Sequence, residues 1–395
     1  MALATQSRLG ILSLLAVIPL SAGAQALEAA RPVSNLFAQE AYTEYALLDD
    51  PATASFRIMY MPLEKEPGAK ILINGTRHGS DGGDIAVWDP RTGKPLEFDY
   101  IGGDEAVDRG LPGRFRPEDH YIVAQLTRPV PQGGEARVVI EKTYRDRRTY
   151  YADGPDGIVW VRGLSAMRFG VILPTGYLLD SVDIASQLSV LADGRLKLAL
   201  ANPSGRGSPV TIRASTSEIE FVANPPADRV FDEDKTLYDL AAPSTHRFRI
   251  EHTVVDSTPG ADSRLDPVFA SLDELEVIDL DTAQILETNA REDGSTHVRR
   301  PLLITNPRQS VRLKLKGVAE DPGYRVEAGE LVFARVLHGL RNTVWLPPGW
   351  EVSRISQPGT IGRHQDRVFV AFINILDVDG LDIEVRARPG DGVSR

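Results

Sequence analysis

The stretch VILPTGY at residues 171–177 returns further along the chain as VWLPPGW at residues 344–350. The surroundings return with it, because residues 162–177 share seven identical positions with the residues 173 places later. The identical residues are Arg162, Leu164, Arg168, Val171, Leu173, Pro174 and Gly176. Self-similarity at a fixed distance is the signature of a repeated structural unit. The sequence therefore predicts a tandem duplication.

Further matches follow in the same order along the chain. Residues 56–58 recur as 248–250, and Asp89 recurs as Asp279. The offset then falls from 190 at Leu96 to 178 at Thr127, so the first copy holds extra residues, which we place within 102–120. The predicted organisation is copy 1 at 40–215 with lobes at about 40–130 and 131–215, a linker at 216–235, and copy 2 at 236–390 with lobes at about 236–306 and 307–390.

Short runs of alternating apolar and polar residues, separated by Gly, Pro and Asp, fill both copies. The pattern predicts an all-β fold, a tandem duplication of antiparallel β-sandwich modules with two small lobes in each module. Residues 71–78 predict a hairpin that turns at Asn-Gly, and residues 266–277 predict a short helix. In LPTGY we expect the proline to end a strand, Gly176 to take a positive φ and Tyr177 to start the next strand.

The first 24 residues have the features of a secretory signal peptide. They contain Arg8, an apolar core at 10–20 and small residues before the cleavage site, with cleavage after residue 26 as an alternative. The core is too short to span a bilayer, and we expect no transmembrane anchor after cleavage. Loss of Arg8 changes the net charge from −11 to −12, which argues against nucleic-acid binding. The leader, the absence of cysteine and the excess of Arg over Lys favour a bacterial periplasmic or extracellular protein.

The chain carries no P-loop, metalloprotease or serine-hydrolase motif. Among the seven histidines only His246 and His252 are close in sequence. Six residues along a strand span about 20 Å, which is too far for one metal ion. We therefore assign no catalytic residue, no metal site and no cofactor. Arg162 and Arg168 recur in copy 2 and are interpreted as braces of the fold.

Residues that only one copy carries are better candidates for function. The stretch KTYRDRRTYY at 142–151 sets arginines among tyrosines, whereas the matching stretch of copy 2 loses this cluster. Residues 120–127 and 136–143 are expected to pair as a hairpin that turns at 131–134, which would bring the cluster close to the extra segment 102–120. The predicted ligand-binding or partner-binding residues are Arg114, Phe115, Arg116, Arg145, Arg147, Arg148, Tyr150 and Tyr151. The alternative is a solvated hairpin whose tyrosines cover a sheet edge.

Together these features favour a non-catalytic periplasmic or secreted binding or assembly protein. Its partner would be another envelope protein or a polysaccharide. The alternative function is a secreted carbohydrate-directed hydrolase with its site between the lobes. Two carboxylates about 5 to 9 Å apart in a cleft would favour that hydrolase.

Overall fold

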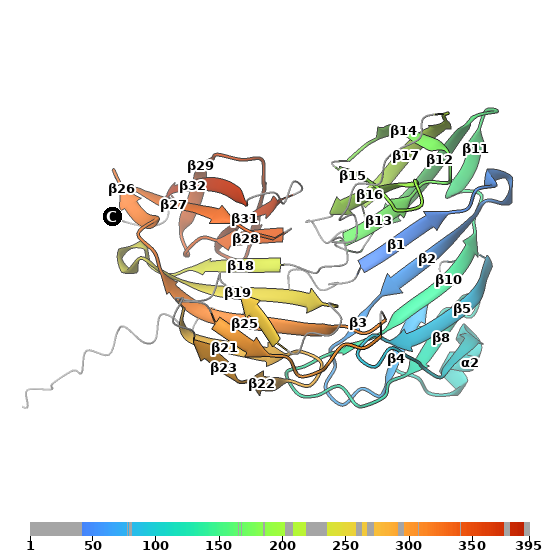
Figure 1. Ribbon diagram of the computed structural model, residues 1–395, viewed down its shortest axis with the longest axis horizontal. Helices are drawn as coiled ribbons and strands as arrows, with labels where there is room; N and C mark the ends of the chain where they lie inside the picture. Colours follow the sequence, from blue (N-terminus) through green and yellow to red (C-terminus); the bar gives the residue numbers. More distant parts are fainter. Residues whose placement is uncertain are drawn as a thin grey trace, which may run out of the picture. The chain divides into compact units, whose positions relative to one another are not determined.

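The computed structural model describes residues 42–390 apart from 77, 79–80, 165, 167, 185, 202–207, 219–234, 258–262, 267–271, 291–295, 307, 340 and 375–379. The predicted signal peptide and most of the predicted linker lie outside the described residues. The fold is all-β, as expected, and contains several sheets. We call residues 42–218 the first half and residues 235–390 the second half. In Figure 1 the strands of the first half run from blue to green, and those of the second from yellow to red.

The first half is built on an eight-stranded sheet, the first large sheet. Its strands lie in the order β15 (Ser186–Val190), β16 (Leu196–Ala201), β13 (Arg168–Ile172), β1 (Tyr42–Leu47), β2 (Ser55–Met61), β10 (Val139–Arg145), β5 (Asp81–Asp89) and β6 (Lys94–Pro95). The sheet takes strands from both sides of residue 130, so both predicted lobes of copy 1 contribute to it.

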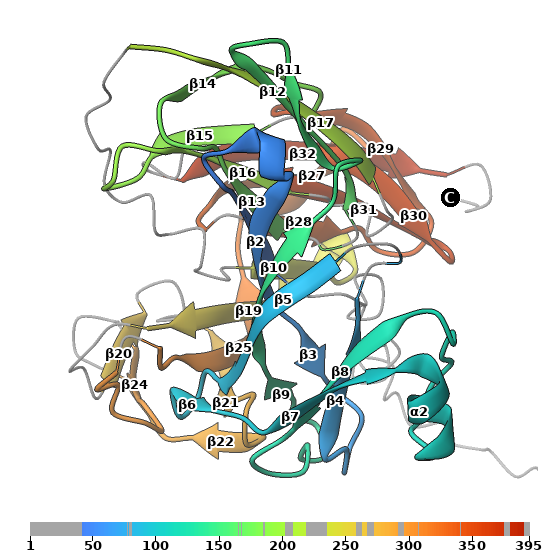
Figure 2. The ribbon, with the colours of Figure 1, turned by 90° about the vertical axis from the view of Figure 1, so that its right-hand side faces the viewer.

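Three smaller sheets complete the first half. A four-stranded sheet has the order β11 (Tyr150–Asp153), β12 (Gly157–Leu164), β17 (Ser208–Thr216) and β14 (Tyr177–Val182). A three-stranded sheet has the order β4 (Ile71–Gly75), β8 (His120–Gln125) and β7 (Phe98–Gly102), and β3 (Leu63–Glu64) pairs with β9 (Ala136–Arg137). The α-helix α2 (Gly103–Asp108) follows β7 and lies beside β8 in Figure 2.

The second half contains the second large sheet and two smaller sheets. The large sheet has the order β30 (Thr360–His364), β31 (Arg367–Ile373), β28 (Arg341–Trp345), β18 (Lys235–Leu240), β19 (Arg247–Asp256), β25 (Val311–Glu320), β21 (Asp273–Asp279) and β22 (Gln284–Leu286). The smaller sheets are β26 (Tyr324–Glu327), β27 (Glu330–Leu337), β32 (Leu381–Pro389) and β29 (Trp350–Ile355), and then β20 (Ser263–Asp266), β24 (Thr296–Arg299) and β23 (Thr288–Ala290).

The strand orders of the two halves correspond one to one. The strands of the second large sheet, taken in order from β30 to β22, correspond one by one to the strands of the first large sheet, taken in order from β15 to β6. The four-stranded and three-stranded sheets correspond in the same way. The register also agrees, because Ile58 lies opposite Tyr45 and Lys142, while Ile250 lies opposite Tyr238 and Gly317.

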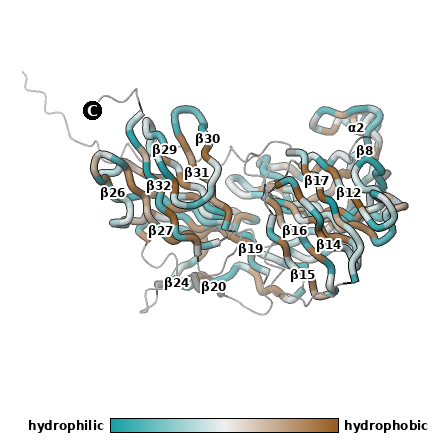
Figure 3. Tube along the Cα trace, turned by 90° about the horizontal axis from the view of Figure 1, so that it is seen from above, coloured by the Kyte–Doolittle hydropathy of each residue, from teal (hydrophilic) through white to brown (hydrophobic). Residues whose placement is uncertain are grey.

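Apolar side chains on the inner faces of the strands join the sheets. Phe56 of the first large sheet packs in one core with Trp160 of the four-stranded sheet. In a second core, Ile140 of the same large sheet packs with Ile122 of the three-stranded sheet. Along the strands in Figure 3, hydrophobic residues alternate with hydrophilic ones, as strands with one buried face require.

The repeated Leu-Pro-x-Gly stretch forms the predicted turn in both halves. β13 ends just before Leu173, and β14 begins at Tyr177. Gly176 has a φ of 77° and Gly349 a φ of 79°, which L side chains rarely adopt. The turn prediction is therefore confirmed at both sites.

Several finer predictions were wrong. Each large sheet is mixed rather than antiparallel, because β1 runs parallel to β13 and β18 runs parallel to β28. Asn74 and Gly75 do not form a turn but lie within β4, opposite Ile122 and Tyr121. Residues 273–277 of the predicted helix belong to β21, and 267–271 lie outside the described residues. At the expected Asn-Gly turn and the expected helix, hydrogen bonds to neighbouring strands outweigh the local preference.

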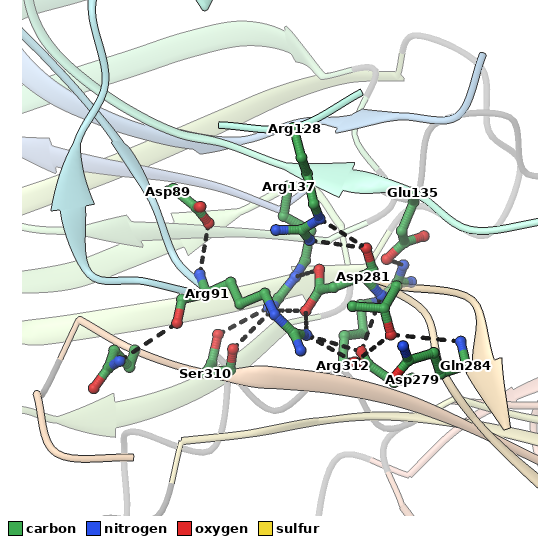
Figure 4. A network of polar contacts seen from close by, with 12 residues as sticks. Asp89, Arg91, Arg128, Glu135, Arg137, Asp279, Asp281, Gln284, Ser310 and Arg312 are labelled. Atoms are coloured by element: carbon green, nitrogen blue, oxygen red, sulfur yellow. Dashed lines mark hydrogen bonds and ion pairs between the residues drawn. The ribbon is translucent and has the colours of Figure 1, made fainter. Parts of the chain in front are cut away.

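The two halves meet through a network of buried charges, shown in Figure 4. Nε and a terminal nitrogen of Arg137 donate to the two carboxylate oxygens of Asp281 at 2.9 and 2.7 Å. Arg312 pairs with Glu135, and Arg91 also reaches Asp281 at 3.2 Å. Burial opposes ionisation of Asp281, but Arg137 outweighs this effect and lowers the pKa of the carboxyl group. The halves are thus joined by ion pairs that lie away from water.

Candidate functional site

The extra segment 102–120 forms the end of β7, helix α2 and the loop that leads to β8. Arg114 and Arg116 are exposed on this loop. Phe115 is half-buried, and its ring meets the ring of Tyr121 edge-on with 4.9 Å between the centroids. A Cβ on Gly103 would lie 1.8 Å from the carbonyl oxygen of Arg116, so only glycine fits where the helix touches the loop. Packing therefore holds the segment in place while both arginines face solvent.

The arginine and tyrosine stretch 142–151 forms the end of β10, a turn and the start of β11. Arg145 and Arg147 are exposed, and the Arg148 side chain is 62% exposed. Tyr151 is partly exposed, on β11 opposite Val159. Tyr150 is fully buried, and its hydroxyl donates to the carbonyl oxygen of Leu48 at 2.9 Å. Tyr150 belongs to the core, and burial raises the pKa of its hydroxyl group.

The hairpin that was expected to bring these segments together does not form. Strand β8 pairs with β4 and β7, whereas β10 pairs with β2 and β5 in the large sheet. The prediction was wrong because Ile122 of β8 and Ile140 of β10 bury their apolar faces against each other across two layers. Residues 126–138 carry the chain from one layer to the other.

His78 connects the two segments instead. A terminal nitrogen of Arg148 donates to the carbonyl oxygen of His78 at 3.2 Å. The Nδ1 atom of His78 lies 2.8 Å from Oδ1 of Asp119, at the end of the extra segment. Asp119 in turn donates its backbone N–H to the carbonyl oxygen of Arg116 at 3.1 Å. Neither His78 nor Asp119 was predicted from sequence, since a single histidine in no motif carries no local signal.

Aromatic rings lie beside the same connection. The rings of Tyr100 and His120 stack with their centroids 5.2 Å apart at an angle of 24°. The Tyr100 hydroxyl lies 3.6 Å from the position that a Cβ would take on Gly82, which is opposite Tyr144. Both Tyr100 and His120 are exposed. They present a flat, partly apolar surface of the kind that packs against a sugar ring or a peptide.

The exposed arginines here differ from many others on the molecule. Among the described residues, no carboxylate pairs with the side chains of Arg114, Arg116, Arg145 or Arg147. Glu118, in the same loop, is an exposed carboxylate, and no positively charged side chain among the described residues pairs with it. Exposed arginines that do pair with a carboxylate include Arg109, Arg213, Arg363 and Arg388. Arg148 differs from these four, because its Nε lies 3.2 Å from Oδ1 of Asp146. We call Arg114, Arg116, Arg145, Arg147 and Arg148 the arginine surface.

A buried amine lies at the inner face of the same strand. Nζ of Lys142 donates to the side-chain oxygen of Asn74 at 2.8 Å and lies 5.1 Å from the centre of the Tyr144 ring. Burial, with a contribution from the nearby Arg162 guanidinium, lowers the pKa of Lys142 to about 7. The residue is therefore a buried base that titrates near neutral pH.

Comparison with protein-family models matches no family, and comparison with curated proteins matches none of them. Within the described ranges, no three acidic or histidine side chains lie close enough together to hold a metal ion. No described helix combines the length and apolar character needed to cross a bilayer.

Proposed function

We propose that this protein is a non-catalytic binding or assembly protein of the bacterial periplasm or extracellular medium. In this proposal residues 1–24 are its secretory leader, and two tandemly duplicated β-sandwich modules, 40–215 and 236–390, form the mature chain. The one-to-one correspondence of strand orders supports the duplication. The arginine surface is its binding site for an anionic partner, either an envelope protein or a polysaccharide.

The observation that carries this proposal is that Arg114, Arg116, Arg145 and Arg147 are exposed without carboxylate partners among the described residues. They lie on two segments that His78 connects. Side chains of like charge repel each other, so gathering them costs free energy unless a partner supplies the opposite charge. Guanidinium groups bind carboxylates, sulfates and phosphates with paired hydrogen bonds. A local positive field can capture such a group although the net charge of the chain is −11.

The stacked rings of Tyr100 and His120 add a second type of contact. An arginine can fix a charged group while an aromatic face covers the apolar face of the same ligand. The arginines and both rings are exposed, as expected for residues that contact a long partner lying across the surface. A polymer or a protein loop fits this arrangement better than a small metabolite, which usually occupies a concave site.

The test is partner capture from a periplasmic extract with the full chain and a variant in which Arg114, Arg116, Arg145 and Arg147 are replaced by Ser. The matched control replaces Arg109, Arg213, Arg363 and Arg388, which are exposed but paired with carboxylates. Both variants remove the same charge. We expect the first to lose at least tenfold in affinity and the second to retain the wild-type value.

A change of opposite sign sharpens the test. Replacing Glu118 by Gln removes the exposed carboxylate of the same loop and should strengthen binding two- to threefold. Equal loss in the two arginine variants would show that general charge, and no particular surface, controls capture. Release of sugars from a captured glycan by the wild-type chain would instead support a carbohydrate-directed hydrolase.

A further inference from the structure

The contact between the two halves is made twice, with the roles of the halves exchanged. The backbone N–H of Glu135 donates to the carbonyl oxygen of Leu280 at 2.8 Å, and the N–H of Ser310 donates to the carbonyl oxygen of Pro90, also at 2.8 Å. Glu135 corresponds to Ser310, because β10 and β25 have the same register against β2 and β19. Pro90 corresponds to Leu280, one residue after the matched Asp89 and Asp279.

The turns that carry these carbonyl groups have the same internal structure. Gly93 donates its N–H to the carbonyl oxygen of Asp89 at 2.8 Å, and Ala283 donates to that of Asp279 at 2.7 Å. The carboxylates of these two aspartates also accept the backbone N–H two residues later, at 2.8 and 3.1 Å. Gly93 and Ala283 both have positive φ, 67° and 60°.

The side chains follow the same exchange. Arg137 and Arg312 are equivalent, and Arg137 donates to Ser310 Oγ at 2.8 Å while Arg312 pairs with Glu135. The carbonyl oxygen of Asp281 accepts from Arg128 at 2.8 Å. The equivalent carbonyl oxygen, that of Arg91, accepts from Gln309 at 3.5 Å, so it also bonds across the contact, although Gln309 is not the residue equivalent to Arg128.

Size is matched across both versions of the contact as well. A Cβ on Gly134 would lie 3.2 Å from Cβ of Ala283, and a Cβ on Gly93 would lie 3.1 Å from Cγ of Gln309. Gly134 corresponds to Gln309, and Gly93 corresponds to Ala283. Each version therefore combines one glycine with one larger residue. In one version the strand segment supplies the glycine, Gly134, and the turn supplies Ala283. In the other the turn supplies the glycine, Gly93, and the strand segment supplies Gln309.

We propose that this interface is a pseudo-two-fold contact in which one self-complementary patch meets a second copy of itself. The patch comprises residues 89–93 and 134–137 in the first half and 279–283 and 309–312 in the second. The chain is then a covalently linked dimer of one ancestral module. This inference rests on the proposed duplication and not on the arginine surface. A contact that repeats with exchanged roles is the defining property of a two-fold interface.

The differences between the two patches specify which copies pair. Arg137 binds the carboxylate of Asp281. The residue of the first half that corresponds to Asp281 is Arg91. Two first-half patches would bring Arg91 against Arg137, which is unfavourable. In a pair of second-half patches Arg312 could meet Asp281, but two Asp281 carboxylates would also face each other where Arg91 and Asp281 meet here. Each patch therefore carries a charge that disfavours a copy of itself and favours the other patch.

The test uses the full chain and exchanges the distinctive residues between the halves. Arg91→Asp and Asp281→Arg alone each place like charges together and should lower the Tm strongly. The fourfold variant Arg91→Asp, Asp281→Arg, Glu135→Ser and Ser310→Glu restores the pairs of Arg137 and Arg312 in the reversed orientation. Arg128, which is not exchanged, then lies near a positive charge. We expect it to recover at least half of the summed Tm losses of its single variants. A fourfold variant that loses the full sum would overturn the two-fold interpretation.

A second, uncharged cycle decides the question if the fourfold variant does not fold. Gly93→Ala should lower the Tm because the new methyl group meets both Asn306 and Gln309, at a backbone φ of 67°. Combining it with Gln309→Gly recreates the pair that Ala283 and Gly134 already form. The double variant should lose less than the sum of the two single variants. Strict additivity would contradict the proposal, whatever partner the arginine surface captures.

Discussion

Arg162 in the first half and Arg335 in the second occupy equivalent positions but have different surroundings. Arg162 lies over the rings of Tyr45 and Phe56, with 5.0 and 5.7 Å between guanidinium carbon and ring centre. Arg335 lies over Tyr238 and Phe248 at 5.8 and 5.5 Å. It also donates to a carboxylate, Asp321, at 2.5 Å. One terminal nitrogen of Arg162 is buried without a hydrogen-bond partner among the described residues.

The difference extends to the neighbouring strand. Lys142 in the first half corresponds to Gly317 in the second, where Leu272 fills the space that a side chain would take. The first half therefore holds two cations against the inner face of its large sheet, Lys142 of β10 and Arg162 of the facing strand β12. The second half pairs its arginine with a carboxylate and packs apolar atoms in place of the lysine. Two halves with the same strand order can thus keep the same aromatic contacts and still differ in buried charge.

The largest expected effect comes from giving the second half the residue of the first. In Gly317→Lys the new Cβ would lie 2.8 Å from Cβ of Leu272, and the amine would be buried. Overpacking and burial together should cost on the order of 4 kcal/mol of unfolding free energy. Urea denaturation measures it, with Gly317→Ala as the smaller control. A wild-type midpoint for Gly317→Lys would show that the two halves do not differ in this way.

The converse change removes the buried amine of the first half. The pKa of Lys142 is about 7 when folded, below the ordinary lysine value of 10.5, so the unfolded chain binds more protons between these values. Stability should therefore rise with pH by roughly 1.4 kcal/mol per unit at most, or about 3 kcal/mol from pH 7 to 9.5.

Lys142→Met should abolish this rise and stabilise the protein at pH 7. Denaturation at several pH values compares it with Lys316→Met, a control at a more exposed lysine of the second half. An identical slope in wild type and Lys142→Met would rule out Lys142 as its source.

The repeated turn should respond equally in the two halves. Gly176→Val and Gly349→Val force a β-branched residue to adopt φ values of 77° and 79°. Each should cost about 1 to 3 kcal/mol. Nothing lies within 4 Å of a Cβ on Gly176, so backbone strain rather than collision is the cause there. If both variants melt at the wild-type temperature, the turn does not need glycine.

The smallest effect concerns two buried tyrosines. Tyr150 donates to the carbonyl oxygen of Leu48 at 2.9 Å, and Tyr324 donates to that of Ala241 at 2.5 Å. Tyr150→Phe and Tyr324→Phe remove only the hydroxyl group and should each cost about 1 kcal/mol. Thermal unfolding of both variants measures the loss. A large loss in one half alone would mean that the two hydrogen bonds are not equivalent.

Part of the candidate site could be predicted from sequence, and part could not. Arg114, Arg116 and Arg147 lie exposed on segments that copy 2 does not match, as the comparison of copies indicated. Tyr150 was assigned to the same surface but lies in the core, because neighbouring residues on a strand face opposite sides. His78 was missed because its role depends on a contact with Asp119, 41 residues away.

The sequence by itself determined the all-β class and the turns at Leu173–Tyr177 and Leu346–Trp350. These depend on local chemistry, since proline lacks a donor, glycine accepts a positive φ and alternation selects strands. Only the tertiary structure decided which strands pair, which side chains meet at His78 and how far burial lowers the pKa of Lys142. Strands β8 and β10 are near neighbours in sequence yet join different sheets, because burying Ile122 against Ile140 requires two layers. Such outcomes depend on the free energy of the whole packed chain, which no short stretch of sequence contains.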